Sequence, residues 1–309
     1  MDLALSVPQI PSPGETIQAI ACEMIPGGKG ANQAYACGRL GGSCVFLSAV
    51  GEDEAGERLL RNLRSAGVVT DHIIRAKGMP TGSAVILVDR KGENCIIAVP
   101  GANAACDLAY LNGSRALMRQ TDMVLAQLET PVPDVCACLA QARSLGKYTI
   151  LNPAPVPQTA LPEELYPCLD CIVPNETELE RLTGHAAGSE QEVREAAELL
   201  LKKGVGNVVV TLGARGAMLV QPGNTELYRS IPVQAVDTTA AGDIFIAGMT
   251  VRLAEGYPLP DAIRFANAAA AISVTRKGAQ TSIPDREEVM RVYQKQKQMN
   301  MREDLREKI

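Results

Sequence analysis

The sequence predicts an α/β protein with a mostly parallel sheet that helices cover on both faces. From about residue 123 onwards, short apolar strands alternate with longer helices, a rhythm typical of βαβ units. In addition, the apolar strand at 207–211 runs into a glycine turn, which is typical of the ligand-binding edge of such sheets. The expected strands are 123–127, 148–151, 171–173 and 207–211, and the expected helices are 134–145, 176–183 and 190–203.

The first hundred residues predict a smaller, β-rich element. Loose alternation of polar and apolar residues over 14–24 indicates a half-exposed strand. Residues 83–88 and 94–99 are apolar and are joined by a polar turn, which predicts a hairpin. We therefore expect one α/β domain over residues 1–309, with the β-rich element drawn from residues 3–26 and 80–100.

Other segments of the chain predict further helices and one short strand. Gly27 opens a small-residue loop that runs into an Ala-rich helix ending near Gly42. A short strand is expected at 45–50, and residues 53–66 place apolar side chains on one face of a helix. The tail at 294–309 is polar and charged, which predicts a peripheral helix or a frayed end.

The composition excludes several classes of protein. Apolar residues make up 46% of the chain, which is enough for a large core. The net charge is −5 and no basic stripe occurs, which argues against nucleic acid as a partner. No apolar run reaches the roughly 18 residues that span a bilayer, and the first residues lack the layout of a signal peptide.

The nine cysteines do not form a recognisable metal site. Cys136 and Cys138 form one close pair and Cys168 and Cys171 another, but neither pair has a second pair at zinc spacing. Histidine occurs only twice. We interpret the cysteines as free thiols and expect a reducing, cytoplasmic location.

The stretch at 236–245 is the most informative in the chain. Small and polar residues lead up to Asp243, which stands at the start of an apolar helix. Small residues let a backbone approach a ligand closely, and a helix N-terminus binds anions. Asp243 is therefore a candidate general base beside a transferring phosphoryl group. An aspartate that merely caps its helix is the alternative reading of this stretch.

A second small-residue loop, Gly-Gly-Lys-Gly-Ala-Asn-Gln-Ala at 27–34, also runs into a helix. It is neither a Walker loop nor a dinucleotide motif, because Gly30 stands where the Walker pattern needs Ser or Thr and the GxGxxG spacing fails. Together the two loops resemble the two motifs of the ribokinase, or phosphofructokinase-B type, family of carbohydrate kinases. The resemblance covers almost the whole chain and returns at 127–129, 152–155, 174–178, 211–216 and 275–280.

This resemblance implies a fold and an activity. The fold is a Rossmann-like three-layer sandwich of the ribokinase type, with a β-sheet lid formed by residues 3–26 and 80–100. The implied reaction is ATP-dependent phosphorylation of D-ribose at the 5-hydroxyl, with Mg²⁺ required, K⁺ activating and a homodimer formed through the lid. A kinase for 2-deoxyribose or for another sugar or nucleoside of the same family remains an alternative. Such substrates can differ from ribose by one hydroxyl, which makes one hydrogen bond, and loop geometry sets the partner of that bond. A catalytically impaired ligand-binding protein is a rival of another class, and an NAD-dependent oxidoreductase is disfavoured by the missing GxGxxG.

The resemblance also assigns residues to the sugar and to catalysis. Asp243 would be the base, and the N–H groups of Ala241, Gly242 and Asp243 would hold the charge on the phosphoryl oxygens. A tight turn is the alternative for the first loop. The residues implied to bind the sugar are Asp2, Gly28, Lys29, Gly30, Ala31, Asn32, Glu129 and Asp243.

The nucleotide and the cations receive residues in the same way. The residues implied to bind ATP are Asn175, Thr211, Leu212, Gly213, Ala214, Arg215, Gly216, Gly242, Asp243 and Asn267. Asn175 and Glu178 match the family's Asn-x-x-Glu motif near Mg²⁺, although a helix start with an acidic first turn is the alternative. The implied K⁺ loops carry Asp237, Thr239, Ser273, Arg276, Gly278 and Ser282, for which ordinary surface loops are the alternative.

The start of the chain departs from the family pattern. Members of the family carry an apolar first strand just before the aspartate that Asp2 matches, whereas Met1 stands directly ahead of Asp2 here. We therefore expect this strand to be missing, with either an internal methionine taken as the start or weakened stability and ribose affinity. The sheet should then show a gap beside the strands at 45–50 or 123–127.

Overall fold

The computed structural model describes the backbone of residues 1–307 and the side chains of residues 1–299. Its body is built on a six-stranded sheet in the order β12-β11-β10-β9-β8-β7. Strands β7, β8, β9 and β10 pair in parallel. Strands β11 and β12 continue the sheet beyond β10 with antiparallel pairing. Their bounds are β7 Met123–Ala126, β8 Tyr148–Leu151, β9 Cys171–Ile172, β10 Asn207–Thr211, β11 Ala217–Gln221 and β12 Asn224–Tyr228.

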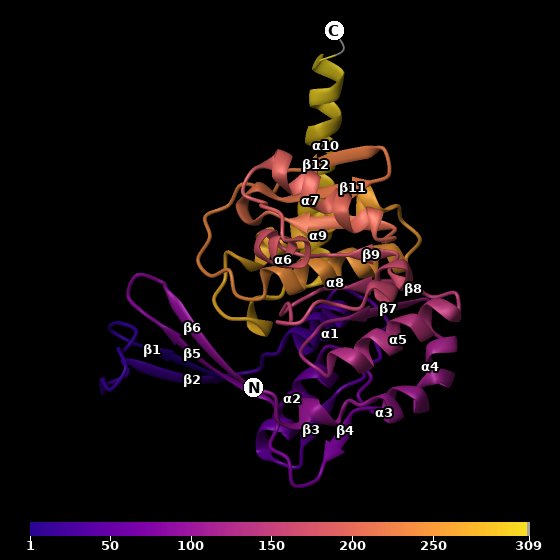
Figure 1. The fold of residues 1–309 in the computed structure, drawn as a ribbon. Coiled ribbons are helices and arrows are strands. Elements are labelled where there is room, and N and C mark those ends of the chain that lie inside the picture. Colours follow the sequence, from indigo (N-terminus) through magenta and orange to yellow (C-terminus); the bar gives the residue numbers. More distant parts are fainter. Residues whose placement is uncertain (308–309) are drawn as a thin grey trace.

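Helices cover both faces of this sheet, so the body has three layers (Figure 1). Val208 and Val210 of β10 are buried against one layer, whereas Val209 between them is buried against the other. This alternation follows from the period of two in a strand. The first layer contains α5 Val132–Ser144, α6 Glu176–Thr183 and α7 Glu190–Lys202, and the second contains α8 Ala241–Ala254 and α9 Leu259–Ser273. The predicted α/β fold is confirmed.

Further helices extend the body around its second layer. α1 (Lys29–Arg39) packs against α8 through a core that α10 (Arg286–Glu307) also joins. α2 (Glu54–Ser65) is capped by Asp53, whose carboxylate accepts a hydrogen bond from the N–H of Gly56 at 2.8 Å. The tail expected to be helical is so as far as residue 307, while residues 308–309 lie outside the described backbone. Two short helices, α3 (Leu108–Gly113) and α4 (Arg115–Arg119), lead into β7.

A separate four-stranded sheet, here called the small sheet, projects from one side of the body (Figure 1). Its order is β2-β1-β5-β6, with bounds β1 Asp2–Ser6, β2 Ala21–Ile25, β5 Ser83–Val88 and β6 Asn94–Val99. The predicted hairpin is therefore present. The strand predicted over 14–24 is wrong in its first half, because the pairing with β1 begins only at Ala21 and residues 7–19 form a loop.

The sheet of the body ends abruptly at β7. Among the described residues, β7 pairs only with β8, and β3 (Ala49–Gly51) pairs only with β4 (Ile74–Ala76) in a sheet of its own. No ladder joins β3 to β7, which is the gap expected beside 45–50 or 123–127. Each of the two strands consequently has one edge of backbone groups without a strand partner.

Within the described backbone, no helix is both long and apolar enough to cross a membrane.

Candidate active site

The first turn of α8 leaves two backbone N–H groups unpaired. Ala240 is the N-cap residue and adopts a left-handed conformation with φ 61° and ψ 8°. The N–H of Ala241 donates to the carbonyl of Thr238 at 3.2 Å, whereas those of Gly242 and Asp243 meet no acceptor among the described residues. A Cβ added at Gly242 would touch no atom within 4 Å, so the space beside this turn is open. A helix start of this kind is suited to an anion.

The carboxylate of Asp243 is held from outside its own helix. Asn32 Nδ2 donates to Oδ2 at 3.0 Å and Gln33 Nε2 donates to Oδ1 at 2.9 Å. Because Ala240 is the N-cap and Asp243 makes no hydrogen bond to the α8 backbone, the capping interpretation is excluded. Asp243 is only 8% exposed. Burial raises its pKa, while the charge of Lys29 and the two amide donors act in the opposite direction.

The first small-residue loop lies against two more carboxylates. Gly28 is the N-cap of α1, and the N–H of Lys29 donates to Glu129 Oε2 at 2.8 Å. Asp2, from β1, lies on Gly27 so closely that an added Cβ would be 1.9 Å from its Oδ2. A side chain at position 27 would therefore displace the Asp2 carboxylate. The fold thus brings Asp2, the loop and Glu129 together, although they are far apart in sequence.

The charges of these groups act on one another. Burial raises the pKa of Asp2 and of Glu129, and the negative charge of Asp243 raises both further. The charge of Lys29 lowers the pKa of Glu129 and of Asp243. A cluster of carboxylates around one ammonium group offers many hydrogen-bond acceptors to a ligand that is rich in hydroxyl groups.

The remaining loop residues pack below this cluster. Gly30 and Ala31 form the first turn of α1, and an added Cβ at Gly30 would be 3.0 Å from Gln127 Oε1. Asn32 is 6% exposed, and its side-chain oxygen Oδ1 accepts a hydrogen bond from Gln280 Nε2 at 3.1 Å. The structure therefore commits much of the Asn32 amide to protein partners, and one N–H of its Nδ2 remains for a ligand.

The glycine turn after β10 lies beside the start of α6. Asn175 and Thr211 form a parallel bridge between their backbones. Across the turn, a Cβ added at Gly216 would be 2.0 Å from the carbonyl oxygen of Tyr228, so the two chain segments touch. Asn267 of α9 donates to that same carbonyl at 3.1 Å. Residues 211–216, Asn175 and Asn267 therefore gather where strands β9 and β10 end. Arg215 also pairs with Glu176 there.

Asn175 and Glu178 form a capping box at the start of α6. Asn175 Oδ1 accepts from the N–H of Glu178 at 2.8 Å, and Glu178 Oε2 accepts from the N–H of Asn175 at 2.9 Å. Glu178 has a pKa raised by burial, and the charges of both Lys29 and Asp243 act on it. The pair therefore starts a helix, as the alternative interpretation expected, and also lies within electrostatic range of the carboxylate cluster.

Asp237 ties together the two loops that flank α8 and α9. Its Oδ1 accepts from the N–H of Thr239 at 2.9 Å, and its Oδ2 accepts from the N–H of Gly278 at 2.8 Å. Burial acts to raise its pKa, but these hydrogen bonds prevail and the pKa is lowered. Arg276 donates its N–H to Ser273 O at 3.0 Å, and Ser282 lies in the following 3₁₀ turn. In the described part of the chain, no three His, Cys, Asp or Glu side chains gather as metal ligands.

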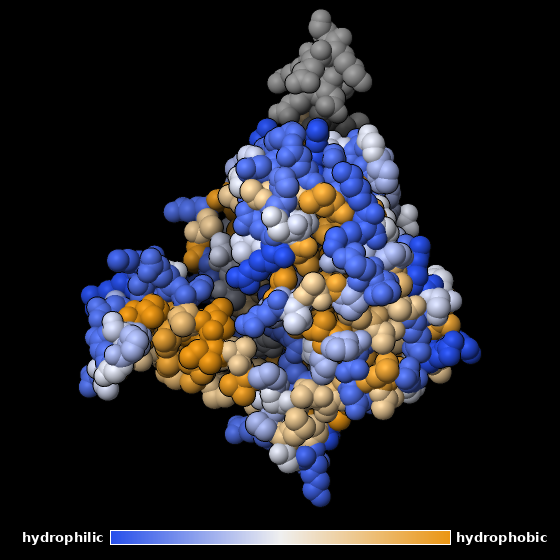
Figure 2. Space-filling view, in the orientation of Figure 1, coloured by the Kyte–Doolittle hydropathy of each residue, from blue (hydrophilic) through white to orange (hydrophobic). Residues whose placement is uncertain are grey.

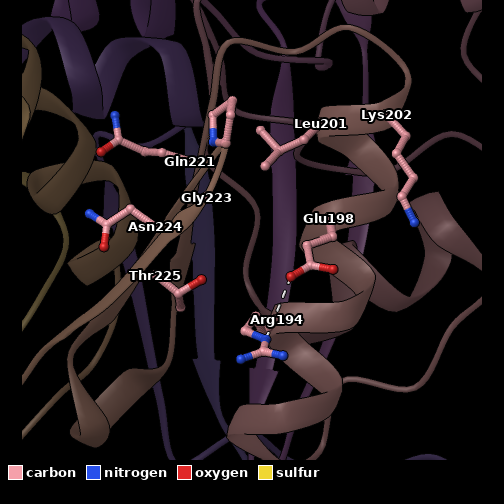
Figure 3. A pocket seen from close by; sticks show the side chains of 9 residues that line it. Arg194, Glu198, Leu201, Lys202, Gln221, Gly223, Asn224 and Thr225 are labelled. Atoms are coloured by element: carbon pink, nitrogen blue, oxygen red, sulfur yellow. Dashed lines mark ion pairs between the residues drawn. The ribbon is translucent and has the colours of Figure 1, made fainter.

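The surface is hollowed between the small sheet and the body (Figure 2). A different cavity, of about 520 Å³, lies between α7 and the β11–β12 turn (Figure 3). Two of its charged residues, Arg194 and Glu198, form an ion pair at 3.5 Å. None of the candidate site residues lines this cavity, so it is separate from the candidate active site.

Comparisons with known proteins point in one direction. The sequence profile of the pfkB family carbohydrate kinases matches residues 1–286. A ribokinase from Haemophilus influenzae is 42% identical over 289 residues, covering 94% of each chain. A deoxyribokinase from Salmonella typhi is 34% identical over 93% of this chain and 94% of its own. The structure of Arabidopsis thaliana ribokinase complexed with ribose and ATP superimposes with a TM-score of 0.87 at 34% identity, covering 94% of this chain and 95% of that chain.

Proposed function

Because the chain belongs to the pfkB family of carbohydrate kinases, we propose that it transfers the γ-phosphoryl group of ATP to the 5-hydroxyl of D-ribose. The observation that carries this proposal is one juxtaposition. The buried carboxylate of Asp243 stands at the α8 start, whose N–H groups at Gly242 and Asp243 meet no acceptor among the described residues, and the carboxylates of Asp2 and Glu129 lie within electrostatic range of it. A base, an anion site and a hydroxyl-binding cluster are the parts that such a transfer needs.

The sugar would bind between the small sheet and the first loop. Its ring hydroxyls donate to the carboxylates of Asp2 and Glu129 and accept from the loop at 28–31 and from Asn32 Nδ2. The 5-hydroxyl then faces Asp243. As the bond from this oxygen to the γ-phosphorus forms, Asp243 accepts the proton, and the bond from phosphorus to the β–γ bridging oxygen breaks. The N–H groups of Gly242 and Asp243 hold the charge on the transferred group. Ala241 belongs to the same turn, but its N–H donates to the carbonyl of Thr238.

ATP would lie along the edge of the sheet that leads to this turn. Residues 211–216 form its floor, and Asn267 and Asn175 hold the backbone segments on either side. The open space at Gly213, where an added Cβ would meet no atom within 4 Å, leaves room for the nucleotide. Its phosphates would then run from Asn175 toward Gly242.

We also propose that two cations bind at this site. Mg²⁺ would be held near Asn175 and Glu178 through water and the ATP phosphates, and it supplies neutralising positive charge when it is bound. K⁺ would be held by the loop pair that Asp237 ties together, since hard oxygens without a tight cage suit this ion. The loop residues that would form its site are Asp237, Thr239, Ser273, Arg276, Gly278 and Ser282.

The small sheet would join two copies of the chain. Residues paired across a sheet share a face, so Met24, Leu3, Val85 and Ile97 form one apolar row across all four strands. Met24 and Ile97 are 51% and 58% exposed. Asp2, one residue before Leu3, lies on the opposite face. This apolar row therefore points away from the sugar and is free to pack against a second copy. Figure 2 shows apolar residues, in orange, at the surface of the small sheet.

Turnover of a panel of sugars tests the proposed substrate. Purified protein is assayed with ATP and ribose, 2-deoxyribose, fructose and a nucleoside, with and without Mg²⁺ and K⁺. The proposal expects the highest kcat/KM for ribose. Higher kcat/KM for 2-deoxyribose would instead favour the activity named for the Salmonella typhi relative.

The nine free cysteines fit a reducing compartment, so we place the enzyme in the cytoplasm.

A further inference from the structure

A chain of buried amide side chains leads to the carboxylate of Asp243. Gln33, on α1, is 1% exposed, and its Nε2 donates to Asp243 Oδ1 at 2.9 Å and to Asn152 Oδ1 at 3.1 Å. Asn152 is 5% exposed and donates its own Nδ2 to the carbonyl of Val173 at 3.0 Å. Gln127 donates its Nε2 to Gln33 Oε1. Every polar atom of the Gln33 amide therefore has a partner.

These partners fix the orientation of the Gln33 amide. A glutamine side chain can place its oxygen or its nitrogen toward a neighbour, and only the nitrogen can donate. The donor from Gln127 requires the oxygen on one side, and the acceptors Asp243 and Asn152 require the nitrogen on the other. A flipped amide would bring two oxygens together at Asp243. The network thus presents an N–H group, and nothing else, to Asp243 Oδ1.

We propose that Gln33 is a positioning residue for the catalytic base, held by Gln127 and Asn152 so that it aims the carboxylate of Asp243 at the sugar hydroxyl. The inference rests on the proposed kinase function and assigns Gln33 no contact with the sugar. Gln33 fixes one carboxylate oxygen and Asn32 fixes the other. The rotation of the carboxylate about its last bond is thereby restricted before the substrate arrives, which is the kind of preorganisation that precise proton transfer needs.

The same contact favours the ionised form of Asp243. Burial favours the protonated carboxyl, and a donated hydrogen bond favours the carboxylate. The charged groups that act together with Asp243 are Lys29 on α1, Asp2 on β1, Glu129 after β7 and Glu178 on α6. None of these groups changes when Gln33 loses its amide. Removing the donor should therefore raise the pKa of the base, and activity should be lost at a higher pH.

The test compares Gln33→Leu with Gln141→Leu. Gln141 also makes one amide-to-amide hydrogen bond, to Asn112 at 3.1 Å, but on the outside of α5. We expect Gln33→Leu to lower kcat for ribose by about 10- to 100-fold, the range typical of misplaced catalytic groups. Its ribose KM should change less than about threefold, and the acidic limb of its kcat–pH profile should move to higher pH. Gln141→Leu should match the wild type in all three measurements.

A second variant protects the test against misfolding. Gln127 is partly buried and touches Gln33 but not Asp243, so Gln127→Leu should unlock the amide and shift kcat and the acidic limb in the same direction by less. Circular dichroism and ribose calorimetry check that each variant is folded and binds sugar. The proposal is overturned if both variants keep the wild-type pH profile, or if they raise the ribose KM and leave kcat unchanged. A wild-type protein that phosphorylates no sugar would overturn the proposed function instead.

Discussion

Asn32 Nδ2 donates a hydrogen bond to Asp243 Oδ2 at 3.0 Å, which joins side chains 211 residues apart in sequence. The contact links the start of α1 to the start of α8, and these are the two small-residue loops of the chain. The proposed sugar loop and the proposed phosphoryl-binding turn therefore meet at one buried contact. Changes at one loop should consequently be felt at the other.

Asn32→Ala and Glu129→Ala should raise the ribose KM much more than the ATP KM. Each substitution removes a partner of the sugar and leaves other buried polar groups unpaired, which costs about 1–3 kcal/mol, or about 5- to 150-fold in affinity. Steady-state kinetics with each substrate varied in turn measures the two constants. Equal effects on both constants would show that the loop at 27–34 is not a sugar site.

The turnover number should fall on the acidic side at a pH above that of an ordinary aspartate. Burial raises the pKa of Asp243, and a general base works only when it is unprotonated. Activity is therefore full well above the raised pKa and is lost as the pH falls through it. Measuring kcat at saturating ribose and ATP between about pH 4 and 9 checks this, since an exposed aspartate titrates near about 3.9. A kcat that stays constant down to about pH 4 would contradict it.

Ala240→Gly should stabilise the protein by a net amount of up to about 1 kcal/mol, because the left-handed conformation costs a side chain about 1–2 kcal/mol. Ala240 is the one non-glycine residue with positive φ among the described residues. The gain is offset in part by the greater freedom of glycine in the unfolded chain. The control is Ala254→Gly at the end of α8, which should not stabilise. A melting temperature that falls for Ala240→Gly in thermal unfolding would argue against strain at this turn.

The structure explains why some elements could be predicted and others could not. The helix expected at 176–183 has those bounds because a capping box starts it and Gly184 ends it in a left-handed conformation. These are local signals. The β11–β12 hairpin was missed, although Pro222 and Gly223 mark its turn, because its strands are short and one is partly polar.

The site was predictable only in part for a physical reason. The loops that contain Gly28 and Asp243 have recognisable local composition, so sequence located them. The role proposed for Gln33 depends on hydrogen-bond partners 119 and 210 residues away, which no local pattern encodes. Likewise, the left-handed backbone at Ala240 could not be expected from an alanine.

Ile97→Lys should convert the proposed dimer into monomers. Ile97 lies in the apolar row of the small sheet, and a buried lysine without a partner is strongly unfavourable there. Ile96→Lys is a matched control, because Ile96 is the neighbouring residue on the opposite face and is equally exposed, at 57% against 58%. Light scattering at micromolar concentration measures the mass. A wild-type protein that is monomeric, or a dimer unaffected by Ile97→Lys, would rule out this interface.

Asp243 is the proposed general base of this carbohydrate kinase. Asp243→Asn keeps the size of the side chain and removes its ability to accept the proton. We expect phosphoryl transfer to ribose to fall by at least about 10²-fold, the scale of a general base, while ribose binding measured by calorimetry stays within about threefold of the wild type. An Asp243→Asn enzyme that binds ribose normally and turns it over at a near-normal rate would contradict the account.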